Sequence, residues 1–222
     1  MHRRTLLQTA ALATLPLPVA AQTGAARART LRFVPQAGLA VLDPIFNPTT
    51  IVTTHGFCVF DTLYGADRQL RPRPQMASGH TVSADGLTWT IRLRDGLVFH
   101  DGEPVRAKDC VASIRRWAAR DGFGAILMRV TADLSATDDR TIVFRLNRPF
   151  PALLDALAKP AASPCFMMPE RLASQPADRP LTDMVGSGPW KFVAAEFVQG
   201  SRAVYVKNEQ YVPRDEPAEA AS

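Results

Sequence analysis

LTWTIRLRDGLVFHDGEPVRAKDCVASIRRW, residues 87–117, is the stretch that decides the fold of this chain. Its first part alternates apolar and polar residues with a period of two, which is the pattern of a strand with one buried face. The apolar positions are Leu87, Trp89, Ile91 and Leu93. The stretch therefore predicts a half-buried strand at its start.

Two Asp-Gly pairs follow this strand, and each predicts a tight turn. Gly96 and Gly102 supply positions where φ can be positive, because glycine has no Cβ to clash with the backbone. Beyond the second turn, apolar residues recur at helical spacing: Ala107, Cys110, Val111, Ile114, Trp117 and Ala118. This stripe predicts an amphipathic helix. The whole stretch is thus a compact α/β module that contains no catalytic motif.

The composition is that of an ordinary folded protein. The chain has 222 residues, of which 46% are hydrophobic and 21% charged, and its net charge is +5. This length fits one large domain or two small ones. The densest basic group, Arg115, Arg116 and Arg120, is predicted to be a solvated helix face. Because nucleic-acid binding needs a basic stripe with stacking aromatic residues, no nucleic-acid partner is expected.

The first 21 residues predict a secretory signal peptide. Arg3 and Arg4 form a basic start, an apolar run follows, and residues 19–21 offer small side chains for cleavage. The run is too short to span a bilayer, and two prolines interrupt it. The paired arginines leave both Sec and Tat export open. We therefore expect an exported, periplasmic protein.

Three cysteines lie beyond this segment, at Cys58, Cys110 and Cys165. An odd number leaves at least one free thiol or an intermolecular pair. Cys110 lies on the apolar stripe of the predicted helix, so burial is expected, whereas a Cys58–Cys165 disulfide stays open. The chain has no C-x-x-C motif, and no ligands stand at metal-binding spacing near His100. Neither a metal nor a cofactor is expected.

No catalytic residue is predicted. The Gly186-Ser187-Gly188 segment is one residue short of G-x-S-x-G, and no partner His and Asp are recognisable. His100 is interpreted as a surface residue beside a turn. Asp61, Asp85 and Asp109 each have a turn or a helix cap to explain them. An exported hydrolase and a self-contained, non-catalytic interaction domain remain as alternative functions.

Outside the central module, the chain alternates short predicted elements. Strands are expected over Thr30–Val34, Thr141–Leu146, Trp190–Ala194 and Val204–Lys207. Helices are expected over Ile51–Tyr64, after Pro151 and around Glu170–Ala173. Residues 65–67 predict a turn, and residues 70–77 are expected to be irregular because two prolines stand in the way of a regular ladder.

The order and amino-acid sequences of these segments resemble the N-terminal portion of family 5 extracytoplasmic solute-binding proteins, the peptide/nickel-type receptors of ABC importers. The matching segments are Leu42–Pro44, Phe60–Tyr64, Ser83–Trp89, Leu93–Gly102, Ala107–Asp109, Asp139–Pro151, Gly186–Trp190 and Asn208–Tyr211. Each match alone is weak, and their shared order carries the resemblance. One departure is Arg106, where the family often has threonine. Because arginine cannot accept a hydrogen bond, Asp109 must cap the helix instead.

The resemblance implies an α/β fold of the type II periplasmic binding protein kind. It implies a partial lobe I with an inserted smaller α/β domain, and a lobe II that is largely missing. On that plan, residues 29–52 and 163–212 belong to lobe I, and residues 53–162 form the inserted domain. Residues 213–222 are a tail that begins the truncated remainder.

The resemblance also implies a function without catalysis. Such receptors capture a peptide or a related small solute between two lobes and deliver it to an ABC permease in the inner membrane. The full-length protein is expected to be a monomer, and peptides, nickel chelates, glutathione and sugars all remain open as its solute. By position, ligand contacts are expected at Asn47, Thr49, Thr50, Phe123, Ser163, Cys165 and Phe166. Structural turns are expected at Gly96, Gly102, Gly186 and Gly188.

Overall fold

The computed structural model describes residues 29–214. The predicted signal peptide and the end of the predicted tail lie outside the described residues. The chain divides into two units after Val34. In the first unit, the predicted strand Thr30–Val34 is wrong, because these residues have no strand conformation. A strand exists only where a neighbouring strand completes its ladder, and the alternation of apolar residues does not supply that neighbour.

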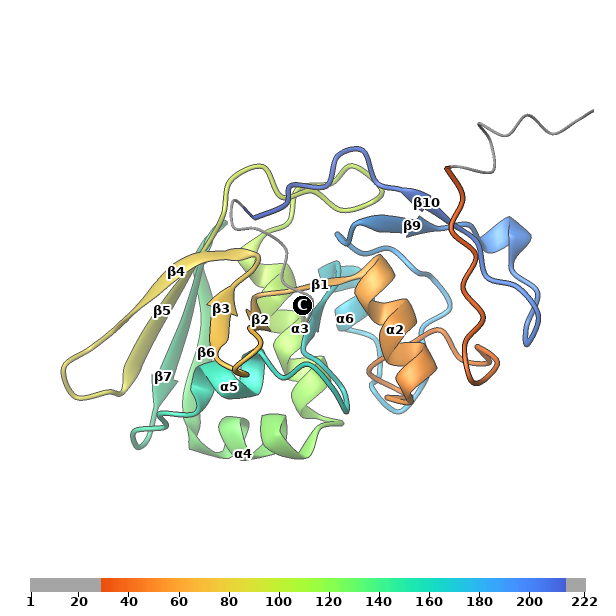
Figure 1. The fold of residues 1–222 in the computed structure, drawn as a ribbon. Helices are drawn as coiled ribbons and strands as arrows, with labels where there is room; N and C mark the ends of the chain where they lie inside the picture. Colours follow the sequence, from red (N-terminus) through yellow and green to blue (C-terminus); the bar gives the residue numbers. More distant parts are fainter. Residues whose placement is uncertain (1–28, 215–222) are drawn as a thin grey trace, which may run out of the picture. The chain divides into compact units, whose positions relative to one another are not determined.

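The second unit contains every helix and strand of the described part (Figure 1). The helices are α2 (Thr50–Val59), α3 (Ala107–Ala118), α4 (Gly122–Val130), α5 (Leu153–Leu157), α6 (Glu170–Ala173) and the 3-10 turn η1 (Ala194–Glu196). The strands are β1 (Asp61–Thr62), β2 (Tyr64–Ala66), β3 (Pro72–Pro74), β4 (Ala77–Val82), β5 (Thr88–Leu93), β6 (Thr131–Asp138), β7 (Thr141–Leu146), β8 (Phe166–Met167), β9 (Trp190–Phe192) and β10 (Tyr205–Lys207).

A four-stranded antiparallel sheet in the order β4-β5-β7-β6 forms the largest layer. The alternating strand predicted from the central stretch is its β5, with Trp89, Ile91 and Leu93 buried. Trp89 lies opposite Phe144 of β7, and Ile91 lies opposite Ile142, so the apolar positions of both strands share one face. Helix α3 packs against β6 and β7, beside the sheet in Figure 1. Strands β5 and β7 were predicted correctly.

Helix α3 has the predicted apolar stripe, and all six of its positions are buried. Asp109 caps it as expected, since its Oδ2 accepts a hydrogen bond from the Arg106 backbone N–H at 2.8 Å. Its Oδ1 accepts from the backbone N–H of Glu170, also at 2.8 Å. One buried carboxylate therefore serves the first turns of both α3 and α6, which satisfies N–H groups that would otherwise lack partners.

The predicted solvated basic face of α3 is wrong at Arg116. Its side chain is 0% exposed and pairs with Asp43, also 0% exposed, at 2.7 Å. Arg116 further donates to the backbone oxygens of Gln175 and Arg179. Arg115 and Arg120 are exposed as expected. The partner of Arg116 is remote in the chain, so helical spacing alone could not reveal the pair.

The predicted helix over residues 51–64 is too long, because α2 ends at Val59. The segment around Gly186 and Gly188 crosses this end, and the Gly188 backbone N–H donates to the Val59 oxygen at 2.9 Å. A Cβ added at Gly186 would lie 2.1 Å from that oxygen. These two glycines therefore allow a close approach of backbones. Gly96 and Gly102, by contrast, have φ of 75° and 92° in the tight turns.

Residues 70–77 are not irregular throughout, because β3 pairs with β2 despite its two prolines. Pro72 and Pro74 stand two residues apart, so both lack an N–H on the same side of the strand. Arg73 between them lies opposite Gly65. Prolines are tolerated when their missing donors face away from the partner strand. The turn predicted at residues 65–67 lies later in the chain, because Gly65 and Ala66 belong to β2 and the turn follows Asp67.

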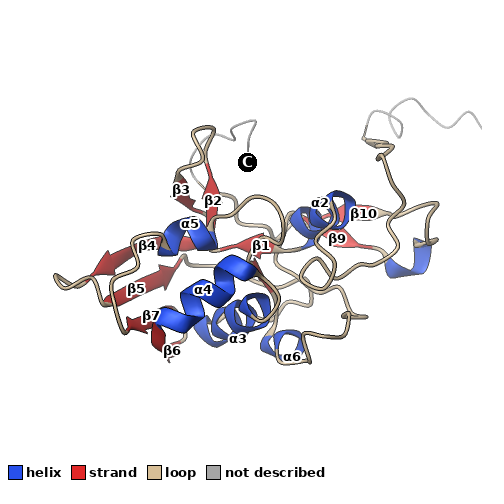
Figure 2. Ribbon diagram, turned by 90° about the horizontal axis from the view of Figure 1, so that it is seen from below, coloured by secondary structure: helices blue, strands red, loops and turns tan. Residues whose placement is uncertain are grey.

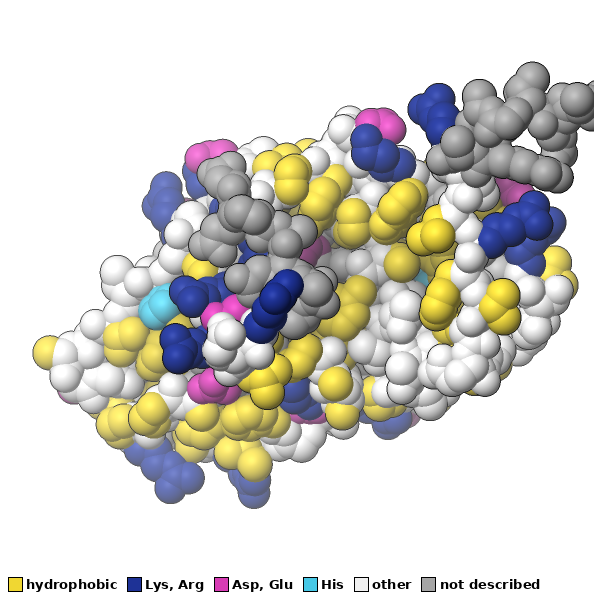
Figure 3. Space-filling model, viewed as in Figure 1, with side chains coloured by type: hydrophobic (Ala, Val, Ile, Leu, Met, Phe, Trp, Pro, Cys, Tyr) yellow, Lys and Arg dark blue, Asp and Glu magenta, His cyan; other side chains and the backbone are white. Residues whose placement is uncertain are grey.

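Figure 2 shows the remaining helices and strands from below. The predicted helices at α5 and α6 and the predicted strands at β9 and β10 are present, although β9 and β10 are shorter than expected. Strands β9 and β10 form an antiparallel hairpin, and α2 packs against β9. Strands β4 and β6 and helix α4 were not predicted. On the face in Figure 3, basic side chains are scattered among apolar ones and form no stripe.

Candidate functional site

The segments predicted to contact a ligand meet around the C-terminal end of α3. Contacts from Trp117, Arg120 and Asp121 reach the loop before α2, the start of α4 and the segment after α5. In Figure 1 this region lies at the lower end of α3, above α4. We call it the α3 rim.

The loop before α2 forms one side of the α3 rim. Asp43 holds its start, because Oδ1 accepts from the backbone N–H of Ile45 at 2.9 Å. The Asn47 side chain accepts from the Thr49 backbone N–H at 3.3 Å. Thr49 and Thr50 are exposed, and Asn47 is half-buried. The predicted contact residues of this loop are thus accessible, and they lead into the first turn of α2.

Arg120 is the cation of the rim and was not predicted as a site residue. Its guanidinium carbon lies 5.3 Å from the centre of the Phe46 ring, and Nη2 reaches the Phe46 oxygen at 3.4 Å. Within residues 29–214 no carboxylate forms an ion pair with it. An exposed guanidinium of this kind keeps donors available for an anionic group. In the sequence, Arg120 stood out only as one of a basic group.

Phe123 lies in the first turn of α4, next to its cap Asp121. Asp121 caps α4 by accepting from the backbone N–H groups of Phe123 and Gly124, both at 2.9 Å. The same carboxylate forms an ion pair with Lys159, so this second cation of the region is already neutralised. Phe123 is half-buried, with its ring edge-on to Phe150.

Ser163, Cys165 and Phe166 lie beneath the rim. All three are buried, Ser163 to 3% exposure and the other two to 0%. The Trp117 indole N–H donates to the Ser163 oxygen at 2.7 Å, which ties this segment to α3. The Phe166 ring contacts Phe57 of α2, which is 42% exposed and was not predicted as a site residue. The structure therefore brings Ser163 to the rim from below and places Cys165 and Phe166 in the core.

The histidines lie in settings that the sequence did not reveal. His55 is buried, and its Nδ1 lies 2.7 Å from the Tyr205 hydroxyl. Burial lowers the pKa of His55 to about 4. His100, interpreted as a surface residue beside a turn, is half-buried, and its Nε2 lies 3.0 Å from the Gly188 oxygen. His80 stacks on Trp89.

The three cysteines are free thiols, so the Cys58–Cys165 disulfide is not formed. Cys110 is buried as expected. Burial raises the pKa of all three thiols, which keeps them protonated. In the described part of the chain, no group of three or more His, Cys, Asp or Glu side chains could hold a metal ion.

Within the described residues, no base lies within hydrogen-bond reach of the Ser187 hydroxyl. This hydroxyl is buried and has no hydrogen-bond partner there, so no histidine or carboxylate is placed to take its proton. A serine nucleophile requires a base within hydrogen-bond reach. The arrangement around Gly186 and Gly188 is thus one of backbone packing.

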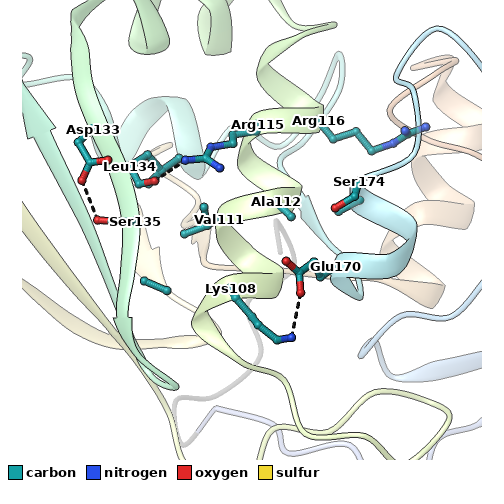
Figure 4. Close-up of a pocket in the computed structure, with 12 residues that line it drawn as sticks. Lys108, Val111, Ala112, Arg115, Arg116, Asp133, Leu134, Ser135, Glu170 and Ser174 are labelled. Atoms are coloured by element: carbon teal, nitrogen blue, oxygen red, sulfur yellow. Dashed lines mark hydrogen bonds and ion pairs between the residues drawn. The ribbon is translucent and has the colours of Figure 1, made fainter.

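A groove of about 400 Å³ lies beside α3, between β6 and α6 (Figure 4). Its charged side chains are already paired within the protein. Lys108 pairs with Glu170 at 2.9 Å, and Arg115 donates to the Leu134 oxygen at 2.7 Å. Asp133 accepts from the Ser135 hydroxyl. The groove therefore presents satisfied polar groups, unlike the α3 rim.

None of the helices between residues 29 and 214 has the length and apolar character needed to cross a membrane.

Comparison with known proteins gives one family. The model of the bacterial extracellular solute-binding proteins, family 5, middle part, matches residues 71–220. A probable peptide ABC transporter periplasmic-binding protein of Sinorhizobium fredii is 43% identical over 211 residues. That match covers 95% of this chain and 39% of the relative. The chain thus spans about two-fifths of that relative's length.

Two further comparisons agree. A glutathione-binding protein of Pectobacterium atrosepticum is 30% identical over 155 residues, covering 69% of this chain and 30% of the relative. The structure of the periplasmic binding protein AgaA from A. tumefaciens R10, in complex with agropinic acid, superposes with a TM-score of 0.66. The identity there is 26%, over 78% of this chain and 35% of the other.

Proposed function

The chain belongs to the bacterial extracellular solute-binding proteins of family 5, and we propose that it captures a small, peptide-like solute for delivery to an ABC permease. The family match over residues 71–220 carries this proposal. Proteins of this family bind solutes and do not catalyse reactions. The fold is that of the N-terminal part of type II periplasmic binding proteins.

The proposed organisation follows the plan of the family. Residues 29–52 and 163–212 form part of lobe I, and residues 53–162 form the inserted domain. Residues 213–222 form the tail that follows them. The solute binds between the lobes, and closure around it is favoured by contacts that exist only when both lobes touch the solute. Export by an N-terminal signal peptide places this capture in the periplasm.

The α3 rim is the proposed solute-contacting surface of this part of the protein. Asn47, Thr49 and Thr50 offer exposed or half-buried polar groups, and Phe123 offers a half-buried ring. Ser163 supports the rim from below, with Cys165 and Phe166 packed behind it. Pockets for small solutes combine apolar and aromatic surface with a few placed polar groups, and the rim has this composition.

Arg120 favours solutes that carry a carboxylate. Its guanidinium has no carboxylate partner in the described part of the chain, and the Phe46 ring and oxygen hold it in place. The solutes named for the relatives are a peptide, glutathione and agropinic acid, all of which carry carboxylate groups. A guanidinium binds a carboxylate through two parallel hydrogen bonds.

The test is isothermal titration of the protein with tripeptides, glutathione and a nickel–histidine chelate. One of these is expected to bind, and Arg120→Gln is expected to weaken that binding by about tenfold to a hundredfold, as for a lost charge-assisted hydrogen bond. Arg129→Gln is the matched control, because Arg129 is an exposed arginine on the neighbouring helix α4. Equal losses in both variants would refute the role of Arg120. If none of the three probes binds, the assignment of a peptide-like solute fails.

A further inference from the structure

A buried polar cluster lies where residues 208–213 pass over β1, away from the α3 rim. Asp61 is 8% exposed, and its Oδ1 accepts from the Thr62 backbone N–H at 2.8 Å. Its Oδ2 lies 3.4 Å from both the Gln75 amide nitrogen and the Tyr211 hydroxyl. The Gln75 amide donates to that hydroxyl at 2.9 Å. The buried carboxylate is thus held by one short and two long hydrogen bonds.

The Arg94 side chain holds the same segment by binding the segment's backbone oxygens. The guanidinium donates to the oxygens of Val212 at 2.8 Å and Pro213 at 2.9 Å. Its Nε donates to the Gln75 oxygen at 2.6 Å. Residues 208–213 have no helix or strand conformation, so they depend on such contacts to stay in place. The Asn208 side chain also donates to the Gly188 oxygen, and the Asn208 backbone N–H donates to the Pro189 oxygen.

We propose that Asp61, Gln75, Arg94 and Tyr211 form a proton-responsive anchor, which holds residues 208–213 firmly when Asp61 is protonated and loosely when it is ionised. The segment reaches the Asp61 carboxylate through the 3.4 Å contact of Tyr211, so opening of the segment exposes Asp61 to water. Ionisation favours the exposed state, because water solvates a charged carboxylate better than a buried site does. This inference does not depend on the identity of the solute.

The burial of Asp61 outweighs the hydrogen bonds and the positive charge around it. Burial raises the pKa of Asp61 to about 6, although hydrogen bonds from Thr62, Gln75 and Tyr211 and the charge of Arg94 act to lower it. Within the described residues, the charged and titratable groups that face Asp61 are Arg94 and Tyr211. Burial raises the pKa of Tyr211 above its ordinary value. The pKa of Asp61 is higher when the segment is closed than when it is open. The extra stability of the closed state is therefore present at low pH and is lost as the pH rises through 6.

Hydrogen exchange of the backbone N–H groups of residues 208–212 tests the anchor in the whole chain, at pH 5 and pH 7.5, after correction for intrinsic exchange rates. Protection in the unmodified protein is expected to fall about tenfold between these pH values, since the closed state loses the advantage of binding a proton. Asp61→Asn is expected to abolish this pH dependence and keep high protection at both values. Arg94→Gln is expected to lose protection at both.

Asp155→Asn is the matched control, because Asp155 is an exposed carboxylate on α5. It should retain the tenfold change. Constant or rising protection in the unmodified protein between pH 5 and 7.5 would overturn the proposal, whether or not the variants fold. An unchanged pH dependence in folded Asp61→Asn would also overturn it.

Discussion

At the scale of single residues, the ion pair of Asp43 and Arg116 joins the loop before α2 to helix α3. Both side chains are fully buried. Asp43 also accepts from the backbone N–H groups of Ile45 and Leu181. One carboxylate therefore joins the loop before α2, helix α3 and the segment after α6. Charges that are buried and paired in this way are costly to leave unpaired.

Arg116→Leu is expected to lower the free energy of unfolding by about 3–5 kcal/mol, because it leaves the Asp43 carboxylate buried without its partner. Urea unfolding followed by circular dichroism measures this change. Arg115→Leu, at the adjacent exposed position, is expected to change the same quantity by no more than about 1 kcal/mol. Similar losses in the two variants would show that the pair has no special role.

At the scale of elements, the crossing of the Gly186–Gly188 segment over the end of α2 determines where that helix stops. The Val59 oxygen accepts from the Gly188 backbone N–H instead of continuing the helical ladder. His100 supports the crossing from the other side, since its backbone N–H donates to the Gly186 oxygen at 2.8 Å. The helix ends where another part of the chain satisfies its last carbonyl groups.

Gly186→Ala is expected to destabilise the protein by about 2–4 kcal/mol, because the new methyl group would overlap the backbone of Val59 and overpack the contact. Calorimetry of thermal unfolding measures this loss of stability as a lower melting temperature. Gly65→Ala is the control, since a Cβ at Gly65 would meet nothing within 4 Å. A melting temperature of Gly186→Ala equal to that of the control would contradict the close approach.

The elements also show which parts of the fold a local sequence pattern can predict. Strands β5 and β7 and helix α3 were predicted because their alternation or stripe is complete within one segment. Strand β3 was missed because its pairing with β2 depends on which side the two missing proline donors face. The end of α2 was misplaced because a segment more than a hundred residues later terminates it.

At the scale of the whole molecule, the chain contains one side of the proposed solute site. The relatives are longer, and this chain spans 39% of the Sinorhizobium fredii protein and 35% of AgaA. In the proposed mechanism, the solute contacts two lobes, so each lobe alone supplies part of the binding free energy. Most of the closed-state contacts require the second lobe.

A form of the protein extended to the length of these relatives is therefore expected to bind its solute at least about tenfold more tightly than the 222-residue chain, since contacts from both lobes add. Titration of both forms with the same peptide, at one temperature and pH, measures the ratio. Equal affinities would contradict binding between two lobes and would favour a site complete within this chain.

The sequence by itself determined the α/β module of residues 88–118, its two Asp-Gly turns and the family to which the chain is similar, because these features depend on residues close together in the chain. Only the tertiary structure decided that Arg116 pairs with Asp43, that Arg120 joins the predicted contact residues at the α3 rim, and that Asp61 is buried beneath Tyr211. The partners in these contacts are 73 residues apart for Arg116 and Asp43 and 150 for Asp61 and Tyr211. Such pairs leave no periodic pattern, since they form only when the fold brings distant segments together.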